Sequence, residues 1–219
     1  MTDQRHSDAD GDVHADQPVV QAGTEPSDAD AAVILLHGRG ATAHGIVRMA
    51  EEFRRSGVAF LAPQAANSTW YPQSFLEPLA VNEPHLSGAL AKVASTLDEA
   101  SAAGIPTERT ALLGFSQGAC LASEFAARNP VRYGGVVALS GGLIGDTVDP
   151  DRYSGSLDGT PAFFGCSDVD PHIPEERVHE SVSVYERLDA DVTERIYEGM
   201  GHTVNEDELD FVSALVDDL

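Results

Sequence analysis

Short runs of continuous apolar residues recur along the chain, and segments with apolar residues at helical spacing separate them. A continuous apolar run bounded by turn residues is typical of a strand that is buried on both faces of a sheet. Apolar residues at helical spacing indicate a helix that buries one face. Strands are therefore predicted over 31–36, 58–62, 109–113, 135–139, 162–165 and 192–197, with an edge strand starting at Val19-Val20.

Helices are predicted between these strands: over 43–56, from a capping Asn82 to Gly104, from Ser116 to Asn129, from about 173 to 188, and from Asn205 onward. Strands that alternate with helices predict an α/β domain over 18–219, with a mostly parallel, doubly wound sheet flanked by helices and no large cap domain. Residues 1–17 are polar, acidic and nearly free of large apolar side chains. We expect a disordered acidic tail there.

A Gly-x-Ser-x-Gly sequence, Gly114 to Gly118, lies between a predicted strand and a predicted helix. A tight turn of this kind holds its serine in strained backbone geometry, so the residues two before and two after must be nearly free of side chains. Ser116 would stand at the apex, with the Gln117 N–H at the start of a helix, where it can bind developing negative charge. The alternative is a glycine-rich turn without chemistry.

Further candidate catalytic residues follow later strands. Asp168 and Asp170 come after the strand 162–165, and His202 comes after the strand 192–197. The carboxyl ends of parallel strands meet at one edge of a sheet, where sites gather. A serine needs a base to take its proton, and the base works best when an acid holds its tautomer. Serine, then an aspartate, then histidine is the chain order of the α/β-hydrolase fold.

Four segments together resemble the phospholipase/carboxylesterase family, which includes acyl-protein thioesterases. The resemblance implies that Ser116 is the nucleophile, Asp170 the orienting acid and His202 the base. Asp170 is preferred to Asp168 because it lies four residues before a proline, as in the family pattern. The segments are His37-Gly38-x-Gly40, Gly114-Phe115-Ser116-Gln117-Gly118-Ala119, Asp170-Pro171-His172-Ile173-Pro174 and Gly199-Met200-Gly201-His202.

The resemblance also implies an oxyanion hole formed by the backbone N–H groups of Arg39 and Gln117. Arg39 stands where the thioesterases usually have leucine, and Ala41 replaces an acidic residue. The segment Trp70-Tyr71-Pro72-x-Ser74-Phe75, with Asn82-Glu83-Pro84, resembles a prokaryotic branch of predicted esterases. These features favour ester hydrolysis over thioesterase specificity.

Aromatic residues in the long segment 64–82 are candidates for the wall of a substrate pocket, although burial as loop core is an equal alternative. The candidate pocket residues are Trp70, Tyr71, Phe75 and Met200. The Arg39 side chain either pairs with an anionic substrate group or, as the simpler interpretation has it, is solvated. His37 is expected to brace the oxyanion loop. No histidine cluster has convincing spacing for a metal site.

Charge adds information about partners and surroundings. The 219 residues include 36 acidic and 13 basic residues, which gives a net charge of -23. A field of this sign repels nucleic acid and anionic membranes, so neither is an expected partner. It also strains the fold at low salt, which leads to the hypothesis of a halophilic protein in a salt-rich cytoplasm. Neither a signal peptide nor a membrane-spanning run is apparent.

The sequence therefore predicts a serine carboxylesterase of the cytoplasm that hydrolyses small or short-chain esters without a cofactor or metal. A thioesterase or a lysophospholipase would use the same three residues. A non-catalytic ligand-binding member of the fold is the alternative from another class. Related proteins often form homodimers, and the sequence leaves that possibility open.

Overall fold

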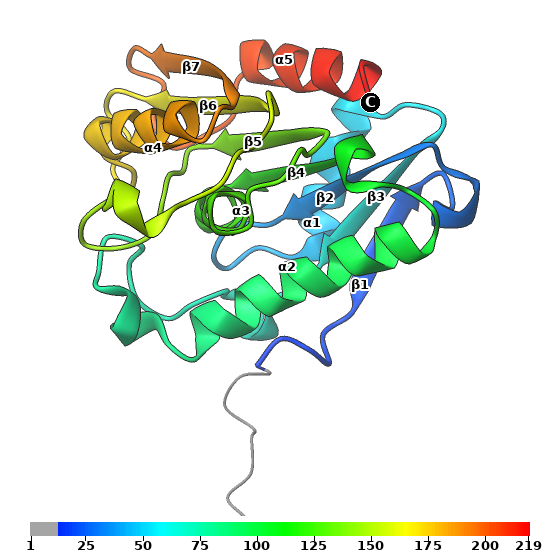
Figure 1. Cartoon of the computed structure of the whole chain (residues 1–219), viewed down its shortest axis with the longest axis horizontal. Helices are drawn as coiled ribbons and strands as arrows, with labels where there is room; N and C mark the ends of the chain where they lie inside the picture. The colour runs from blue at the N-terminus through cyan, green and yellow to red at the C-terminus, as the bar shows by residue number, and fades with distance from the viewer. Residues whose placement is uncertain (1–12) are drawn as a thin grey trace, which may run out of the picture.

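The computed structural model describes residues 13–219. Its centre is a seven-stranded sheet in the order β1-β3-β2-β4-β5-β6-β7 (Figure 1). The first strand pairs antiparallel to its neighbour, and the remaining pairs are parallel. The strands are β1 (Val19–Gly23), β2 (Ala31–Leu36), β3 (Val58–Pro63), β4 (Thr110–Phe115), β5 (Gly135–Leu139), β6 (Pro161–Ser167) and β7 (Asp191–Tyr197).

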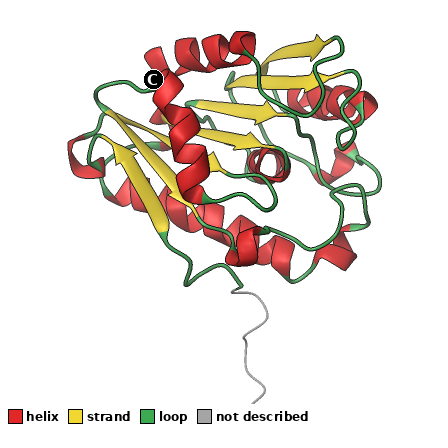
Figure 2. Cartoon of the chain, turned by 180° about the vertical axis from the view of Figure 1, so that it is seen from behind, coloured by secondary structure: helices red, strands yellow, loops and turns green. Residues whose placement is uncertain are grey.

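Helices cover both faces of this sheet, as Figures 1 and 2 show from opposite sides. One apolar core lies between the sheet and α2, α3 and α4, and the second lies between the sheet and α1 and α5. The predicted doubly wound architecture is confirmed, and the described residues hold no cap domain. None of the described helices is long and apolar enough to cross a membrane. The helices are α1 (Ala43–Met49), α2 (His85–Ala102), α3 (Gln117–Arg128), α4 (Glu175–Arg187) and α5 (Glu206–Asp217).

The central strands owe their continuous apolar sequences to this double covering. Successive side chains of a strand point to opposite faces. In β2, Ile34 therefore packs into the core beneath α2 and α3, whereas Leu35 packs into the core beneath α1 and α5, and both are fully buried.

Two predicted helices differ from the structure. The helix predicted over 43–56 ends at Met49 and continues as a 3-10 turn over Ala50–Phe53. In a 3-10 turn, residues three apart share one side, which buries both Ala50 and Phe53. The structure also corrects the capping role predicted for Asn82. Its side chain is fully buried and binds the backbone of residues 73 and 74, while α2 begins three residues later.

The segment that precedes the predicted domain boundary at residue 18 is described only in part. The segment 1–12 of the predicted disordered tail lies outside the described residues, but residues 13–17 form a packed turn. His14 in this turn is fully buried, with one ring nitrogen accepting from the Ala66 N–H and the other bonded to the Trp70 carbonyl. The Lys92 ammonium donates to the carbonyls of Ala15 and Gln17. The pattern of apolar residues did not predict this turn, because hydrogen bonds of polar side chains hold it in place.

The turn between β4 and α3 approaches the neighbouring strand without space for side chains. A Cβ added to Gly118 would overlap the carbonyl of Leu36 on β2, and one added to Gly114 would overlap the backbone of Gly118. These two glycines therefore permit close packing of α3 on the sheet, as the sequence motif requires.

Replacing Gly118 with alanine should destabilise the protein by about 3 kcal/mol or more, because the new methyl group must displace strand backbone. Urea unfolding followed by circular dichroism measures the loss. Gly45→Ala in α1 is the matched control, because its Cβ would have only the Thr42 hydroxyl nearby, at 3.4 Å. The control should change stability by no more than about 1 kcal/mol. An equally stable Gly118→Ala protein would contradict the packing argument.

Candidate active site

Ser116 lies at the apex of the turn between β4 and α3. Its backbone has φ 55° and ψ -120°, a strained conformation for a residue with a side chain. The surrounding structure maintains it: the Ser116 N–H donates to the Leu139 carbonyl at the end of β5, at 2.9 Å. The serine is therefore fixed where the carboxyl ends of the central strands meet.

Two further predicted residues form a chain of hydrogen bonds with this serine. His202, in the segment between β7 and α5, has its Nε2 2.9 Å from the Ser116 Oγ. Its Nδ1 lies 2.7 Å from Oδ2 of Asp170, which follows β6. The histidine side chain is 19% exposed and the aspartate side chain is fully buried. Three residues that are remote in sequence thus share one line of polar contacts.

The two candidate aspartates have different partners. Burial alone would raise the pKa of Asp170, but the hydrogen bond from His202 and those from two backbone N–H groups hold its pKa below the usual value. An ionised carboxylate in this position orients the imidazole. Asp168 instead accepts from the Gly199 N–H at 2.8 Å and does not face His202.

The segment that carries His202 is held by side chains that sequence reasoning missed. The Ser167 hydroxyl accepts from the Gly201 N–H at 3.0 Å, and Asp168 binds the chain two residues earlier. The imidazole of His202 lies between the Phe115 ring and the His172 ring, with centroids 5.0 and 4.9 Å away. In the sequence, the one signal for Ser167 and Asp168 was their position at the end of a predicted strand.

The Ser116 hydroxyl opens into a cavity of about 550 Å³. Tyr71 and Phe75 lie in its wall, as predicted, but Trp70 and Met200 are not among the described residues that line it. Trp70 is fully buried behind the wall, where its Nε1 donates to the His37 carbonyl. The lining residues are Gly38, Arg39, Ala41, Tyr71, Pro72, Gln73, Ser74, Phe75, Phe115, Ser116, Gln117, Cys120, His172, Ile173 and His202.

The turn that follows β2 lies directly beside the serine. A Cβ on Gly38 would be 3.4 Å from the Ser116 Cβ and from the Phe115 carbonyl oxygen. His37 Nε2 accepts from the Ala65 N–H at 3.1 Å, and its Nδ1 is 2.8 Å from the Gly38 carbonyl oxygen. The cavity beside Ser116 is lined by both Arg39 and Gln117, the two residues predicted to form an oxyanion hole.

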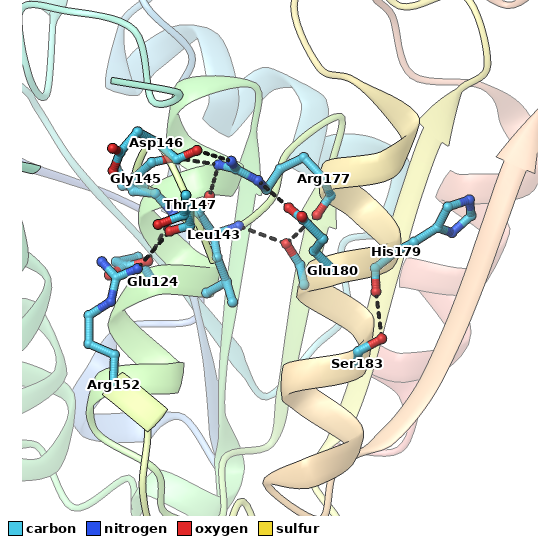
Figure 3. A network of polar contacts seen from close by, with 12 residues as sticks. Glu124, Leu143, Gly145, Asp146, Thr147, Arg152, Arg177, His179, Glu180 and Ser183 are labelled. Atoms are coloured by element: carbon cyan, nitrogen blue, oxygen red, sulfur yellow. Dashed lines mark hydrogen bonds and ion pairs between the residues drawn. The ribbon is translucent and has the colours of Figure 1, made fainter. Parts of the chain in front are cut away.

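The segment that follows β5 is bonded to Phe75, whose carbonyl accepts from the Gly145 N–H. Figure 3 shows the charged side chains that bind this segment. Arg177 of α4 is buried, donates to the carbonyls of Leu143 and Gly145, and lies over the Phe75 ring. On the same segment, Glu124 of α3 accepts from the Ile144 N–H. Buried charged groups that are fully bonded rigidify the elements they join. Arg177 therefore holds the Phe75 ring directly, and Glu124 holds the segment beside it.

Neither cysteine is a second nucleophile. Burial raises the pKa of both thiols, Cys120 and Cys166, to about 12. The thiolate is the reactive form of cysteine, so both side chains stay unreactive at neutral pH. Among the described residues, no group of three or more histidine, cysteine, aspartate or glutamate side chains is arranged to hold a metal ion.

Known proteins share this architecture. A family model described as phospholipase/carboxylesterase matches residues 15–218. A phospholipase/carboxylesterase structure from Dyadobacter fermentans is 40% identical, with a TM-score of 0.88 over 91% of this chain and 96% of that chain. A carboxylesterase structure from Bacillus cereus is 21% identical, with a TM-score of 0.72 over 93% of this chain and 94% of that chain, and shares the fold. Acyl-protein thioesterase 1 of Eremothecium gossypii is 30% identical over 221 residues, 85% of this chain and 88% of the relative.

A buried carboxyl group stabilises the start of the helix that follows His202. Glu208 Oε2 accepts from the Asn205 N–H, and the Asn205 side chain accepts from the Glu208 N–H, which together form a capping box. Glu208 is fully buried against Gly165 of β6, and among the described residues its second oxygen has no hydrogen-bond partner. Burial raises the pKa of Glu208 from 4.5 to about 7, despite the bond from Asn205.

This carboxyl group should make stability depend on pH. Its pKa is higher in the folded protein, so its contribution to stability is present below pH 4.5 and is lost as the pH rises through 7. The loss is about 3 kcal/mol at most. In Glu208→Gln, the free energy of unfolding should fall less between pH 5 and pH 8 than in the wild type, by an amount of this order.

Denaturant unfolding at several pH values measures this slope. The control is Glu206→Gln, which changes an exposed carboxyl group in the same helical turn and should keep the wild-type slope. Parallel slopes for the wild type and Glu208→Gln would show that Glu208 is already ionised at pH 5.

Proposed function

The chain belongs to the phospholipase/carboxylesterase family of α/β-hydrolases, and on this basis we propose that it is a serine carboxylesterase that cleaves small or short-chain esters. Its nucleophile is Ser116, its general base is His202 and its orienting acid is Asp170. The observation that carries the proposal is the unbroken line of hydrogen bonds through these residues, at 2.9 and 2.7 Å. A serine, a base within reach of it and an acid that orients the base form the arrangement required for acyl transfer.

In the proposed reaction, the Ser116 oxygen attacks the ester carbonyl carbon while Nε2 of His202 takes the hydroxyl proton. The tetrahedral intermediate then expels the alcohol, whose oxygen receives that proton from His202. Water, deprotonated by the same nitrogen, attacks the acyl-enzyme and releases the acid. Asp170 keeps the imidazole in the required tautomer and stabilises its charged form.

Negative charge on the intermediate needs donors that are fixed before the reaction begins. The Arg39 and Gln117 N–H groups fit this role because both residues line the cavity beside Ser116, and the second lies at the first position of α3. Within the described chain, neither N–H has a hydrogen-bond acceptor. We propose that these two donors form the oxyanion hole.

The cavity supports a short acyl group. Its wall is formed in part by the buried side chains of Tyr71 and Phe75. A thioester has the same acyl carbon and a better leaving group, and the similarity to acyl-protein thioesterase 1 makes thioester cleavage the second candidate. The same residues would carry out both reactions.

Substitutions of the serine and of the two candidate aspartates should lower the activity by different factors. Ser116→Ala should reduce kcat on p-nitrophenyl butyrate by a factor on the order of 10⁴, because no nucleophile is left. Asp170→Asn should lose a factor on the order of 10³, because the tautomer of His202 is no longer fixed. Asp168→Asn is the matched control and should lose no more than about tenfold, since its bond supports only the loop.

Steady-state kinetics and labelling of the wild type with a fluorophosphonate measure these effects. Loss of activity in Asp168→Asn but not in Asp170→Asn would reverse the assignment of the acid. A folded wild-type protein that neither labels at Ser116 nor hydrolyses any ester would instead favour the ligand-binding alternative.

We also propose that salt stabilises the fold, because the net charge is -23 and the one lysine, Lys92, is buried. The Debye length falls from about 10 Å at 0.1 M salt to about 3 Å at 1 M. The midpoint of thermal unfolding should therefore rise by about 10 °C or more between about 0.1 and 2 M KCl. A midpoint that does not change with KCl would exclude the halophilic hypothesis, and with it the need for a salt-rich cytoplasm.

A further inference from the structure

The segment 70–73 forms one wall of the cavity without belonging to a helix or strand. Within the described chain, no backbone-to-backbone hydrogen bond reaches these four residues. Their carbonyl and N–H groups are bound by side chains instead. The position of this wall therefore depends on a small number of polar side chains from other parts of the fold.

Arg39 provides the largest share of these bonds. Its Nη1 donates to the Pro72 carbonyl at 2.8 Å, and its Nη2 donates to the carbonyls of Tyr71 and Gln73 at 3.0 and 2.6 Å. The side chain predicted to be solvated is thus bound to three consecutive carbonyls. A guanidinium presents several donors in one rigid plane, which suits it to hold a short stretch of backbone.

Gln117 joins the same wall from the other side of the serine. Its Nε2 donates to the Tyr71 carbonyl at 2.8 Å, and its Oε1 accepts from the Trp70 N–H at 3.0 Å. The side chains of both proposed oxyanion-hole residues thus meet at one carbonyl. The wall and the oxyanion hole consequently share two residues, and their relative position is fixed by those residues.

The Tyr71 ring depends on this backbone support. The residue is 1% exposed, and among the described residues its hydroxyl has no hydrogen-bond partner. The ring packs within an apolar core cluster, and its place there follows from the backbone that carries it. Pro72, Gln73 and Ser74, which follow it, are exposed, so bonds from side chains, and not overlying chain, hold this stretch of backbone.

We propose that the Arg39 side chain is a positioning residue, which holds the wall of residues 71–73 against the oxyanion turn and so limits the length of acyl chain that the cavity accepts. This inference rests on the proposed esterase function. The side chain acts on substrate through Tyr71, whose ring occupies space that a longer acyl chain would need. Its positive charge is directed at backbone carbonyls and not at a substrate anion.

The proposal predicts that Arg39→Leu releases the wall. Leucine has no donor, so three carbonyls would lose a charged partner and turn toward water. Amide hydrogen exchange in the peptide that covers 70–76 should become about tenfold faster or more, whereas exchange in α5 should not change. This measurement requires neither substrate nor activity.

The same variant should change chain-length selectivity. The ratio of kcat/KM for p-nitrophenyl octanoate to that for p-nitrophenyl butyrate should rise about tenfold in Arg39→Leu. Arg39→Lys keeps the charge but presents its donors from a single nitrogen, so its ratio should lie closer to that of the leucine variant than to the wild type. Arg54→Leu, which removes an exposed arginine whose side chain is bonded to Glu51, should keep the wild-type ratio.

Unchanged selectivity in Arg39→Leu would overturn the inference, whatever the exchange rates show. A lysine variant that matches the wild type would also overturn it, because charge alone would then explain the role of the arginine. Failure of the proposed function is seen separately, in wild-type protein that neither turns over an ester nor labels at Ser116. Thermal unfolding of each variant confirms that the protein tested is folded.

Discussion

The site depends on the contact between the start of α3 and the adjacent strands. Gly118 brings the helix backbone against the Leu36 carbonyl, and Gly114 brings the end of β4 against the same turn. This close approach raises Ser116 above the sheet in a strained conformation and aligns it with the turn that follows β2. Wider separation of helix and sheet would displace the serine from both the histidine and the predicted oxyanion donors.

Around this rigid centre, the other parts of the site are positioned mainly by bonds between side chains and backbone. Ser167 and Asp168 hold the segment before His202, and Arg39 and Gln117 hold the wall beyond the serine. Parallel strands end in irregular segments whose backbone groups cannot pair with one another in a ladder. Polar side chains at the strand ends supply the missing partners, so the site can be shaped without changing the sheet.

The sequence predicted the strands, the order of elements and the residues that meet at Ser116, because continuous apolar runs and the Gly-x-Ser-x-Gly spacing reflect local constraints. It did not predict the packed turn around His14 or the buried binding role of Asn82, because both depend on bonds to backbone that is distant in sequence. The side chain of Arg39 was misjudged for the same reason: a charged residue in a glycine-rich loop has the pattern of a solvated one. The structure likewise places Tyr71 in the cavity wall and Trp70 behind it. Only the contacts of the folded chain distinguish these two adjacent aromatic residues.

The burial of Lys92 affects how this protein can be handled chemically. It is the single lysine of the sequence, it is 6% exposed, and its ammonium is bound to the carbonyls of the N-terminal turn. An amine-reactive dye, cross-linker or resin therefore meets no accessible lysine on the described surface. Carboxylates, in contrast, cover the molecule, so coupling through activated acids would attach it in many orientations.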